Sequence, residues 1–120
     1  MKYMLMIYNN PATWETLTQD ERQAVIGEAQ SIMKELMDSG EWVGGEGLAD
    51  PSMSKTIRVR DGVPATTDGP FAEAKEQLAG YCLIECETQE RALDIAVRWP
   101  DAKLCAVELR PLMGGGGLEM

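Results

Sequence analysis

The chain has 120 residues, which is enough for one domain with a single hydrophobic core. Twenty acidic against eleven basic side chains give a net charge of −9, so the surface repels nucleic-acid phosphates and anionic lipid headgroups. We therefore expect neither a nucleic acid nor a membrane as a partner.

The first half of the chain predicts a strand, a long helix and a second strand. Residues 2–8 form an apolar run with Tyr3, Leu5 and Ile7 on one face and Met4, Met6 and Tyr8 on the other. Thr18 and Glu21 form a capping box that begins a helix, and Gly40 is a typical residue to end it. Trp42 and Val43 then begin a glycine-rich strand over residues 42–47.

The middle of the chain predicts a hairpin and a short helix. Residues 55–60 alternate apolar and basic side chains, and Asp61-Gly62 is a strong signal for a tight hairpin turn. Pro64 places the returning strand at an edge. Residues 72–78 are predicted to form one or two helical turns after Pro70.

The last third predicts a strand, a helix and a strand. Residues 80–87 are apolar on both faces, and Thr88 caps a helix that ends at Pro100. The inward side of this helix is expected to hold Ala92, Ile95, Ala96 and Trp99. A final strand covers residues 104–109, and residues 114–120 form a glycine-rich tail that we expect to be disordered.

This order predicts an α+β domain over residues 1–113, a ferredoxin-like βαββαβ fold with an inserted β-hairpin. Two helices can cover only one face of the sheet, yet the principal strands are apolar on both. A second copy of the sheet is the simplest cover, so we expect a homodimer joined through the sheet face.

The cysteines and the missing motifs limit the chemistry. Cys82 and Cys86 lie about 13 Å apart if both are in one strand, too far for a disulfide, which needs Cα atoms about 5.5 Å apart. Three thiols and no histidine make a poor zinc site. We expect free thiols, no metal and no cofactor, because no phosphate-binding or dinucleotide motif occurs. With no signal peptide and no apolar run of ~18 residues, we expect a cytoplasmic protein.

Four segments carry a family resemblance: GEGL at 45–48, DGPFAEAKE at 68–76, GY at 80–81 and VELRPLM at 107–113. They resemble the DGPF branch of the YCII-related family. The resemblance implies a ferredoxin-like sheet that dimerises into an α/β barrel. For relatives it implies a proposed histidine–aspartate pair in a cleft, and bacterial genes that neighbour those of extracytoplasmic-function sigma factors. The aspartate corresponds to Asp68, whereas this chain has no histidine.

Asp68 and Glu46 are the candidate carboxylates. Asp68 precedes Gly69-Pro70, so it is either the acceptor of a local turn or a general acid/base whose pKa burial would have to raise. Glu46 stands between two glycines that leave room for a ligand, and it is the candidate neighbour of Asp68.

Arg58, Lys75 and Tyr81 are the other candidate ligand-binding residues. Arg58 shares one hairpin face with Arg60 and is either a carboxylate binder or a solvent residue. Lys75 would meet an anionic substrate, pair with Asp68 or remain solvated. Tyr81 is either a packing residue or a hydroxyl donor to a substrate carbonyl.

Three functions remain open. The first is a dimeric protein that binds a small polar metabolite beside the DGPF loop, in a regulatory role. The second is a cofactor-free lyase, isomerase or hydrolase that uses Asp68, and the third is a protein-interaction adaptor for a transcription regulator.

Overall fold

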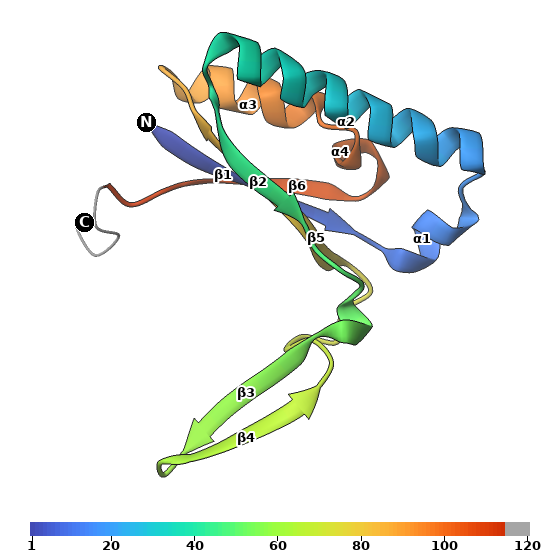
Figure 1. Ribbon diagram of the computed structural model, residues 1–120, viewed down its shortest axis with the longest axis vertical. Coiled ribbons are helices and arrows are strands. Elements are labelled where there is room, and N and C mark those ends of the chain that lie inside the picture. Colours follow the sequence, from blue (N-terminus) through green and yellow to red (C-terminus); the bar gives the residue numbers. More distant parts are fainter. Residues whose placement is uncertain (115–120) are drawn as a thin grey trace.

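A four-stranded antiparallel sheet forms the body of the molecule in the computed structural model, which describes residues 1–114 (Figure 1). Its order is β2-β5-β1-β6, with β1 at Lys2–Asn9, β2 at Trp42–Gly47, β5 at Gln77–Glu85 and β6 at Ala106–Pro111. Every neighbouring pair is antiparallel. The predicted α+β class is confirmed, and the antiparallel sheet is consistent with a ferredoxin-like fold.

Two helices lie together on one side of this sheet (Figure 1). Helix α2, Gln19–Ser39, begins with the predicted capping box: Glu21 N–H donates to Thr18 Oγ1 over 3.1 Å, and Thr18 N–H donates to Glu21 Oε1 over 2.9 Å. It ends at Gly40, whose φ of 81° is left-handed, as expected of a helix-terminating glycine. Helix α3, Gln89–Arg98, begins at the predicted cap Thr88.

Two short helices were not predicted. Helix α1, Pro11–Thr16, begins where Asn10 accepts a hydrogen bond from Ala12 N–H and Pro11 occupies the first turn. Helix α4, Asp101–Leu104, continues the chain after Pro100 into β6. Both short helices lie at the end of the sheet where β1 finishes and β6 begins (Figure 1).

The hydrophobic core lies between the helices and one face of the sheet. The alternation along β1 buries Tyr3, Leu5 and Ile7, and α3 buries the predicted Ala92, Ile95 and Ala96, with Trp99 directly after it. The opposite face carries half-buried apolar side chains from β1 and β5, namely Met4, Met6, Tyr8, Tyr81 and Leu83. The two-faced apolar character predicted for these strands is therefore present.

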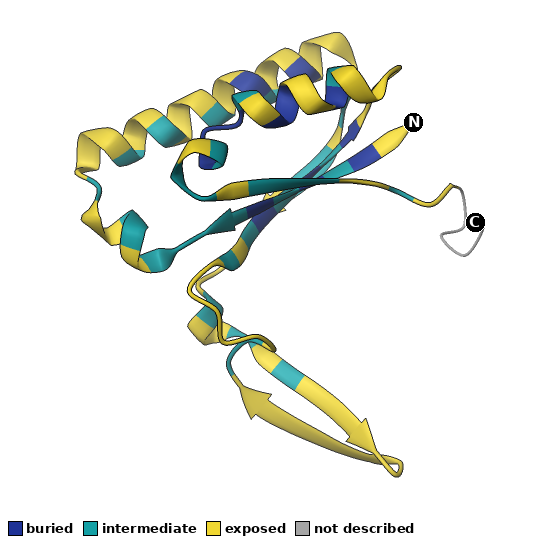
Figure 2. Cartoon of the chain, turned by 180° about the vertical axis from the view of Figure 1, so that it is seen from behind, coloured by how far each residue is buried: buried dark blue, intermediate teal, exposed yellow. Residues whose placement is uncertain are grey.

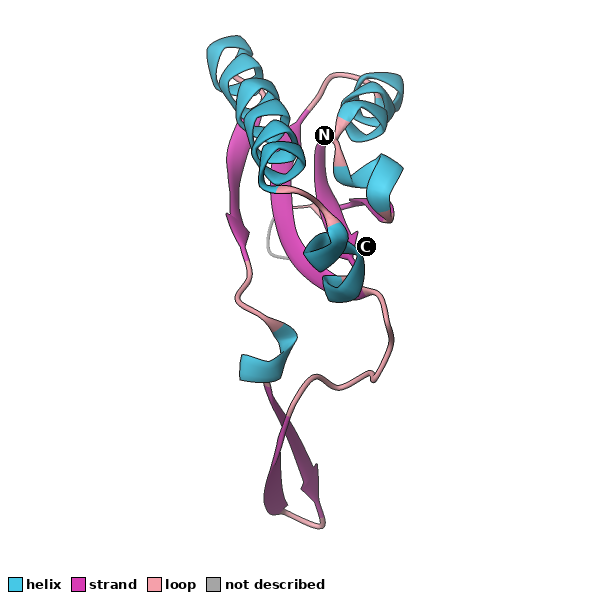
Figure 3. Cartoon of the chain, turned by 90° about the vertical axis from the view of Figure 1, so that its right-hand side faces the viewer, coloured by secondary structure: helices cyan, strands magenta, loops and turns pink. Residues whose placement is uncertain are grey.

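The hairpin extends away from the body as a separate two-stranded sheet (Figure 1). We call this hairpin the arm: β3 at Lys55–Arg60 pairs with β4 at Val63–Asp68. Its predicted turn is confirmed, since Asp61 and Gly62 both have left-handed φ values, 49° and 76°. A single 3₁₀ turn, η1 at Pro51–Met53, precedes it. The arm is exposed almost throughout, whereas buried residues gather in the body (Figure 2), and the side view separates the two parts (Figure 3).

The helix predicted at 72–78 is wrong. Residues 70–76 are irregular, and Gln77 already begins β5, where Gln77 and Leu78 pair with Asn9 and Tyr8. Backbone pairing with β1 thus overrides the local helical preference. The Gln77 side chain ties down the irregular segment, because its Nε2 donates to the Ala72 and Ala74 carbonyls over 2.9 and 2.7 Å.

The remaining predictions concern the thiols and the tail. Cys82, Cys86 and Cys105 are free, as expected. The predicted tail at 114–120 lies, from residue 115 on, outside the described residues. Between residues 1 and 114, every helix is too short or too polar to cross a membrane.

Candidate functional site

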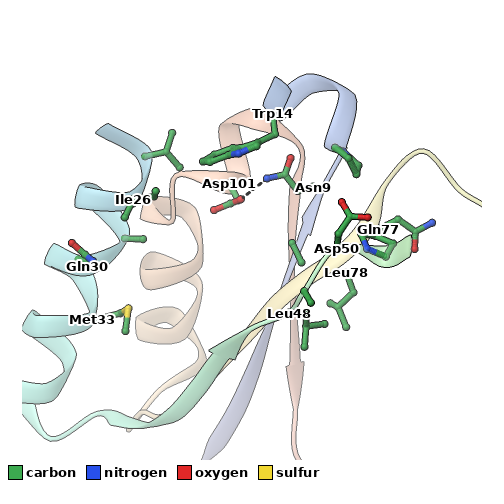
Figure 4. Close-up of a pocket in the computed structure, with 16 residues that line it drawn as sticks. Asn9, Trp14, Ile26, Gln30, Met33, Leu48, Asp50, Gln77, Leu78 and Asp101 are labelled. Atoms are coloured by element: carbon green, nitrogen blue, oxygen red, sulfur yellow. Dashed lines mark hydrogen bonds between the residues drawn. The ribbon is translucent and has the colours of Figure 1, made fainter. Parts of the chain in front are cut away.

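A cleft of about 470 Å³ opens between α2 and the end of the sheet where β5 begins (Figure 4). Its walls are mainly apolar. Trp14 comes from α1, Ile26 and Met33 from α2, and Leu48 and Leu78 from the segments at the end of β2 and the start of β5. The volume is typical of a site for a small organic molecule.

Asp101, the first residue of α4, contributes a carboxylate to the cleft (Figure 4). It is the one buried charged residue within the described chain, at 9% exposure. Asn9 Nδ2 donates to Asp101 Oδ2 over 3.3 Å, and Asp101 takes part in none of the ion pairs among residues 1–114. Burial raises the pKa of Asp101, and hydrogen bonds from its own backbone and the Trp99 side chain oppose this only in part.

Two more acceptors lie in the cleft wall. The amide oxygen Oδ1 of Asn9 is buried and has no hydrogen-bond partner among the described residues. Asp50 caps η1 by accepting a hydrogen bond from Ser52 N–H over 2.9 Å, and hydrogen bonds from the Ser52 side chain and backbone lower the pKa of its carboxyl. The cleft wall therefore carries, besides Asp101, a second carboxylate and an amide oxygen that lacks a donor among residues 1–114.

Two further hollows adjoin this cleft. One, of about 720 Å³, extends toward the arm, shares Leu48 and Leu78 with the cleft, and is bordered by Pro70 and Phe71 of the DGPF loop. The other, of about 320 Å³, shares Met33, Ala79 and Asp101 with it. Asp101 thus lies where the cleft and the smaller hollow meet.

The structure places the predicted carboxylates apart. Asp68 is exposed at the end of β4, where its carboxylate forms an ion pair with Lys55, and it lines neither the cleft nor the two hollows. Gly69 has a φ of 97°, the left-handed torsion predicted beside Asp68. Glu46 pairs with Tyr81 across β2 and β5, and both border the smaller hollow.

The two predicted cations are exposed. Arg58 lies over the Phe71 ring, with Cζ 5.0 Å from the ring centre, and so connects the arm to the DGPF loop. Lys75 is exposed in the irregular segment before β5 and lines neither the cleft nor the two hollows. The structure therefore places Glu46 next to Tyr81, and Arg58 next to Phe71. It does not bring the five predicted site residues together in one site.

Sequence reasoning missed Asp101 and Asn9. An acid directly after Pro100 is a common surface residue, and Asn9 directly follows the strand predicted at residues 2–8. One signal could have indicated that Asp101 is buried. It follows a segment rich in buried residues, which includes Trp99 two positions earlier. No three His, Cys, Asp or Glu side chains in the described part of the chain lie close enough to hold a metal ion.

Comparisons with known proteins give a family and a fold. A family model of the YCII-related domain matches residues 1–114. Uncharacterized protein R00369 of Rhizobium meliloti (strain 1021) is 30% identical over 114 residues, which cover 93% of this chain and 92% of that protein. A solved structure of 5-chloro-2-hydroxyhydroquinone dehydrochlorinase (TftG) from Burkholderia phenoliruptrix AC1100, in complex with 2,5-dihydroxybenzoquinone, is similar over 96% of both chains, with a TM-score of 0.55 and 12% identity. That similarity shows a shared fold.

Proposed function

The chain belongs to the YCII-related domain family, and on that premise we propose that it is a homodimeric small-molecule-binding protein whose ligand occupies the cleft beside Asp101. The observation that carries this proposal is the buried Asp101 carboxylate in a mainly apolar cleft, with no basic side chain paired to it within residues 1–114.

A carboxylate in such a place is unfavourable for folding alone. Removing an ion from water costs on the order of several kcal/mol unless a counter-charge or hydrogen bonds offset it. Asn9 supplies one hydrogen bond of 3.3 Å, near the long end of the useful range, and the hydrogen bonds from the backbone of Asp101 and from Trp99 offset the burial only in part. A ligand that donates to Asp101 would supply the missing compensation, which supports binding as the role of this site.

The dimer part of the proposal rests on the sheet face opposite the helices. Met4, Met6 and Leu83 lie there with Tyr8 and Tyr81, and a second copy of this face would remove them from water. Light scattering at micromolar concentration should give the mass of two chains, and a monomer mass would contradict the dimer.

A cofactor-free enzyme is the second candidate, favoured by the raised pKa of Asp101. A carboxyl with a raised pKa holds its proton more readily than an exposed one, which suits general acid/base catalysis. TftG, a dehydrochlorinase solved with a small ring-shaped molecule, has a similar fold, which makes turnover worth measuring. Asp68 in the DGPF loop remains a candidate acid/base. Because its carboxylate is exposed and paired with Lys55, we favour Asp101 for this role.

Matched variants test both candidates. A metabolite library is screened by thermal shift against the wild type, Asp101→Asn and Asp68→Asn. We expect a ligand whose stabilisation disappears in Asp101→Asn and persists in Asp68→Asn; at 100 times its Kd a ligand stabilises by about 2.7 kcal/mol. Mass spectrometry of the incubated ligand then distinguishes binding from turnover.

The proposal fails in two ways. A ligand that is lost only in Asp68→Asn would move the site to the DGPF loop. A screen with no shift that depends on Asp101 would leave the buried carboxyl as a structural feature of the body.

A further inference from the structure

We infer that the ligand of the cleft is an organic cation, a protonated amine carried on an apolar body about the size of one aromatic ring. This inference rests on the proposed binding function and adds the chemical class of the ligand. It follows from the charges, the hydrogen-bonding groups and the shape of the cleft.

The cleft has negative charge and no positive charge. Neither lysine nor arginine is among the residues that line it, whereas Asp50 and Asp101 are. The smaller hollow also contains Asp101 and is lined by neither lysine nor arginine. A basic side chain, Lys55, borders only the hollow toward the arm, and its ammonium group is paired with Asp68. A carboxylate or phosphate ligand would therefore meet repulsion without a counter-charge.

Arg22 is the basic residue that needs separate consideration, because it lies close to Trp14 in the cleft wall. Its Nε and Nη2 donate to the carbonyls of Trp14 and Glu15, each over 3.2 Å, and its Cζ lies 5.8 Å from the Trp14 ring centre. The guanidinium is thus engaged by the backbone of α1, and Arg22 does not line the cleft.

Three polar groups of the cleft are hydrogen-bond acceptors, and the amide groups of Gln30 and Gln77 line it as well. The Gln77 amide N–H is already held by two backbone carbonyls. Asp101 and Asp50 offer carboxylate oxygens, and Asn9 Oδ1 is a buried carbonyl oxygen without a partner among residues 1–114. An ammonium group has three N–H donors and no acceptor, so it suits the buried Asp101 carboxylate and the unpartnered amide oxygen. An alcohol satisfies one acceptor, and an anion satisfies none.

The rest of the cleft suits an apolar body. Trp14, Ile26 and Met33 form one side, and Leu48 and Leu78 the other (Figure 4). A single aromatic ring on a two-carbon chain fits within about 470 Å³ and brings its ammonium group to Asp101 while the ring contacts these side chains.

Three probes with the same phenylethyl body test the charge: 2-phenylethylamine, the isosteric 2-phenylethanol, and the slightly larger 3-phenylpropionate. Their affinities are measured by titration calorimetry or protein NMR against the intact wild-type protein at neutral pH. We expect the amine to bind at least about tenfold more tightly than the alcohol, and the carboxylate not at all, because one charge-assisted hydrogen bond contributes roughly 1.5–3 kcal/mol.

Two isosteric variants separate the site from the general negative field. Asp101→Asn should remove the preference for the amine over the alcohol. Asp61→Asn removes the same charge at the tip of the arm, where asparagine tolerates the left-handed φ of 49°, and should keep the preference.

Each other outcome overturns the inference. Equal losses in both variants would mean unspecific attraction to an acidic protein, and equal or tighter binding of the alcohol or the carboxylate would assign another ligand class. If none of the three probes binds, the aryl-ammonium assignment fails. The binding function itself still stands in these cases if the library screen yields an uncharged or anionic ligand that depends on Asp101.

Discussion

The body and the arm are built from the same antiparallel pairing, yet only the body has a covered face. In the body, Ile95 is completely buried between the helices and the sheet, whereas Ile57 on the arm is 60% exposed. Both parts have antiparallel ladders; the ladder of the arm is continuous, and that between β1 and β5 shifts register once, between Ile7 and Tyr8. A two-stranded hairpin alone is marginally stable in water, so the comparison teaches that side-chain burial, and not strand pairing, holds this fold together.

The same substitution in both parts gives the largest expected difference. Ile95→Ala should lower the free energy of unfolding by about 2–5 kcal/mol, because it leaves a cavity in the core. Ile57→Ala should change it by less than about 0.5 kcal/mol, as expected of an exposed position. Urea denaturation at one protein concentration measures both.

The contrast between a buried body and an exposed arm would be wrong if Ile57→Ala were as destabilising as Ile95→Ala. The arm would then be packed against a second copy, and its contribution would diminish on dilution as the dimer dissociates. An effect of Ile57→Ala that does not depend on concentration would instead place the arm against its own body.

Ion pairs give the next difference. In the body, Glu41 accepts from Arg91 Nε and Nη2 over 2.9 and 2.8 Å, and these bonds lower its pKa from 4.5 to about 2. Glu41→Gln should destabilise the protein by about 1–2 kcal/mol at pH 7, since its side chain is only 18% exposed. The arm counterpart, Asp68→Asn, removes an exposed pair with Lys55 and should have an effect below about 0.5 kcal/mol.

The pH dependence of this pair has a definite sign. The folded protein holds the pKa of Glu41 below its unfolded value, so the stabilisation is complete above about pH 4.5 and is lost as pH falls toward 2. The difference between wild type and Glu41→Gln should therefore shrink across that window in denaturation curves. A difference that stays constant down to pH 2 would show that packing, and not charge, explains the effect.

The features that sequence predicted correctly depend on neighbours within a few residues. Thr18 and Glu21 are three positions apart, and Asp61 and Gly62 are adjacent, so their geometry follows from local chemistry alone. The α+β class followed from the order of strands and helices along the chain, which is typical of a ferredoxin-like fold.

The features that sequence missed depend on distant segments. Residues 72–78 lack the predicted helix because Gln77 and Leu78 pair with β1, about seventy residues earlier in the chain. Asp101 is buried because α4 lies against the end of β1 and Asn9, which no spacing in the sequence reveals. The candidate site is assembled from such contacts, so its centre could not be predicted, although Glu46 and Tyr81 do border an adjoining hollow.

The smallest expected difference concerns two arginines over aromatic rings. Arg22 in the body lies over Trp14 and also holds two backbone carbonyls, while Arg58 in the arm lies over Phe71, which is 75% exposed. Lysine keeps the charge but loses the planar fork, so Arg22→Lys should cost about 0.5–1 kcal/mol and Arg58→Lys less. Thermal denaturation checks the order of the two effects.

Because Arg22 fixes α1 and therefore the Trp14 wall of the cleft, Arg22→Lys should also weaken ligand binding. If Arg58→Lys is the more damaging change, the arm and the DGPF loop form a unit of their own, and the division into a stable body and a dependent arm is wrong.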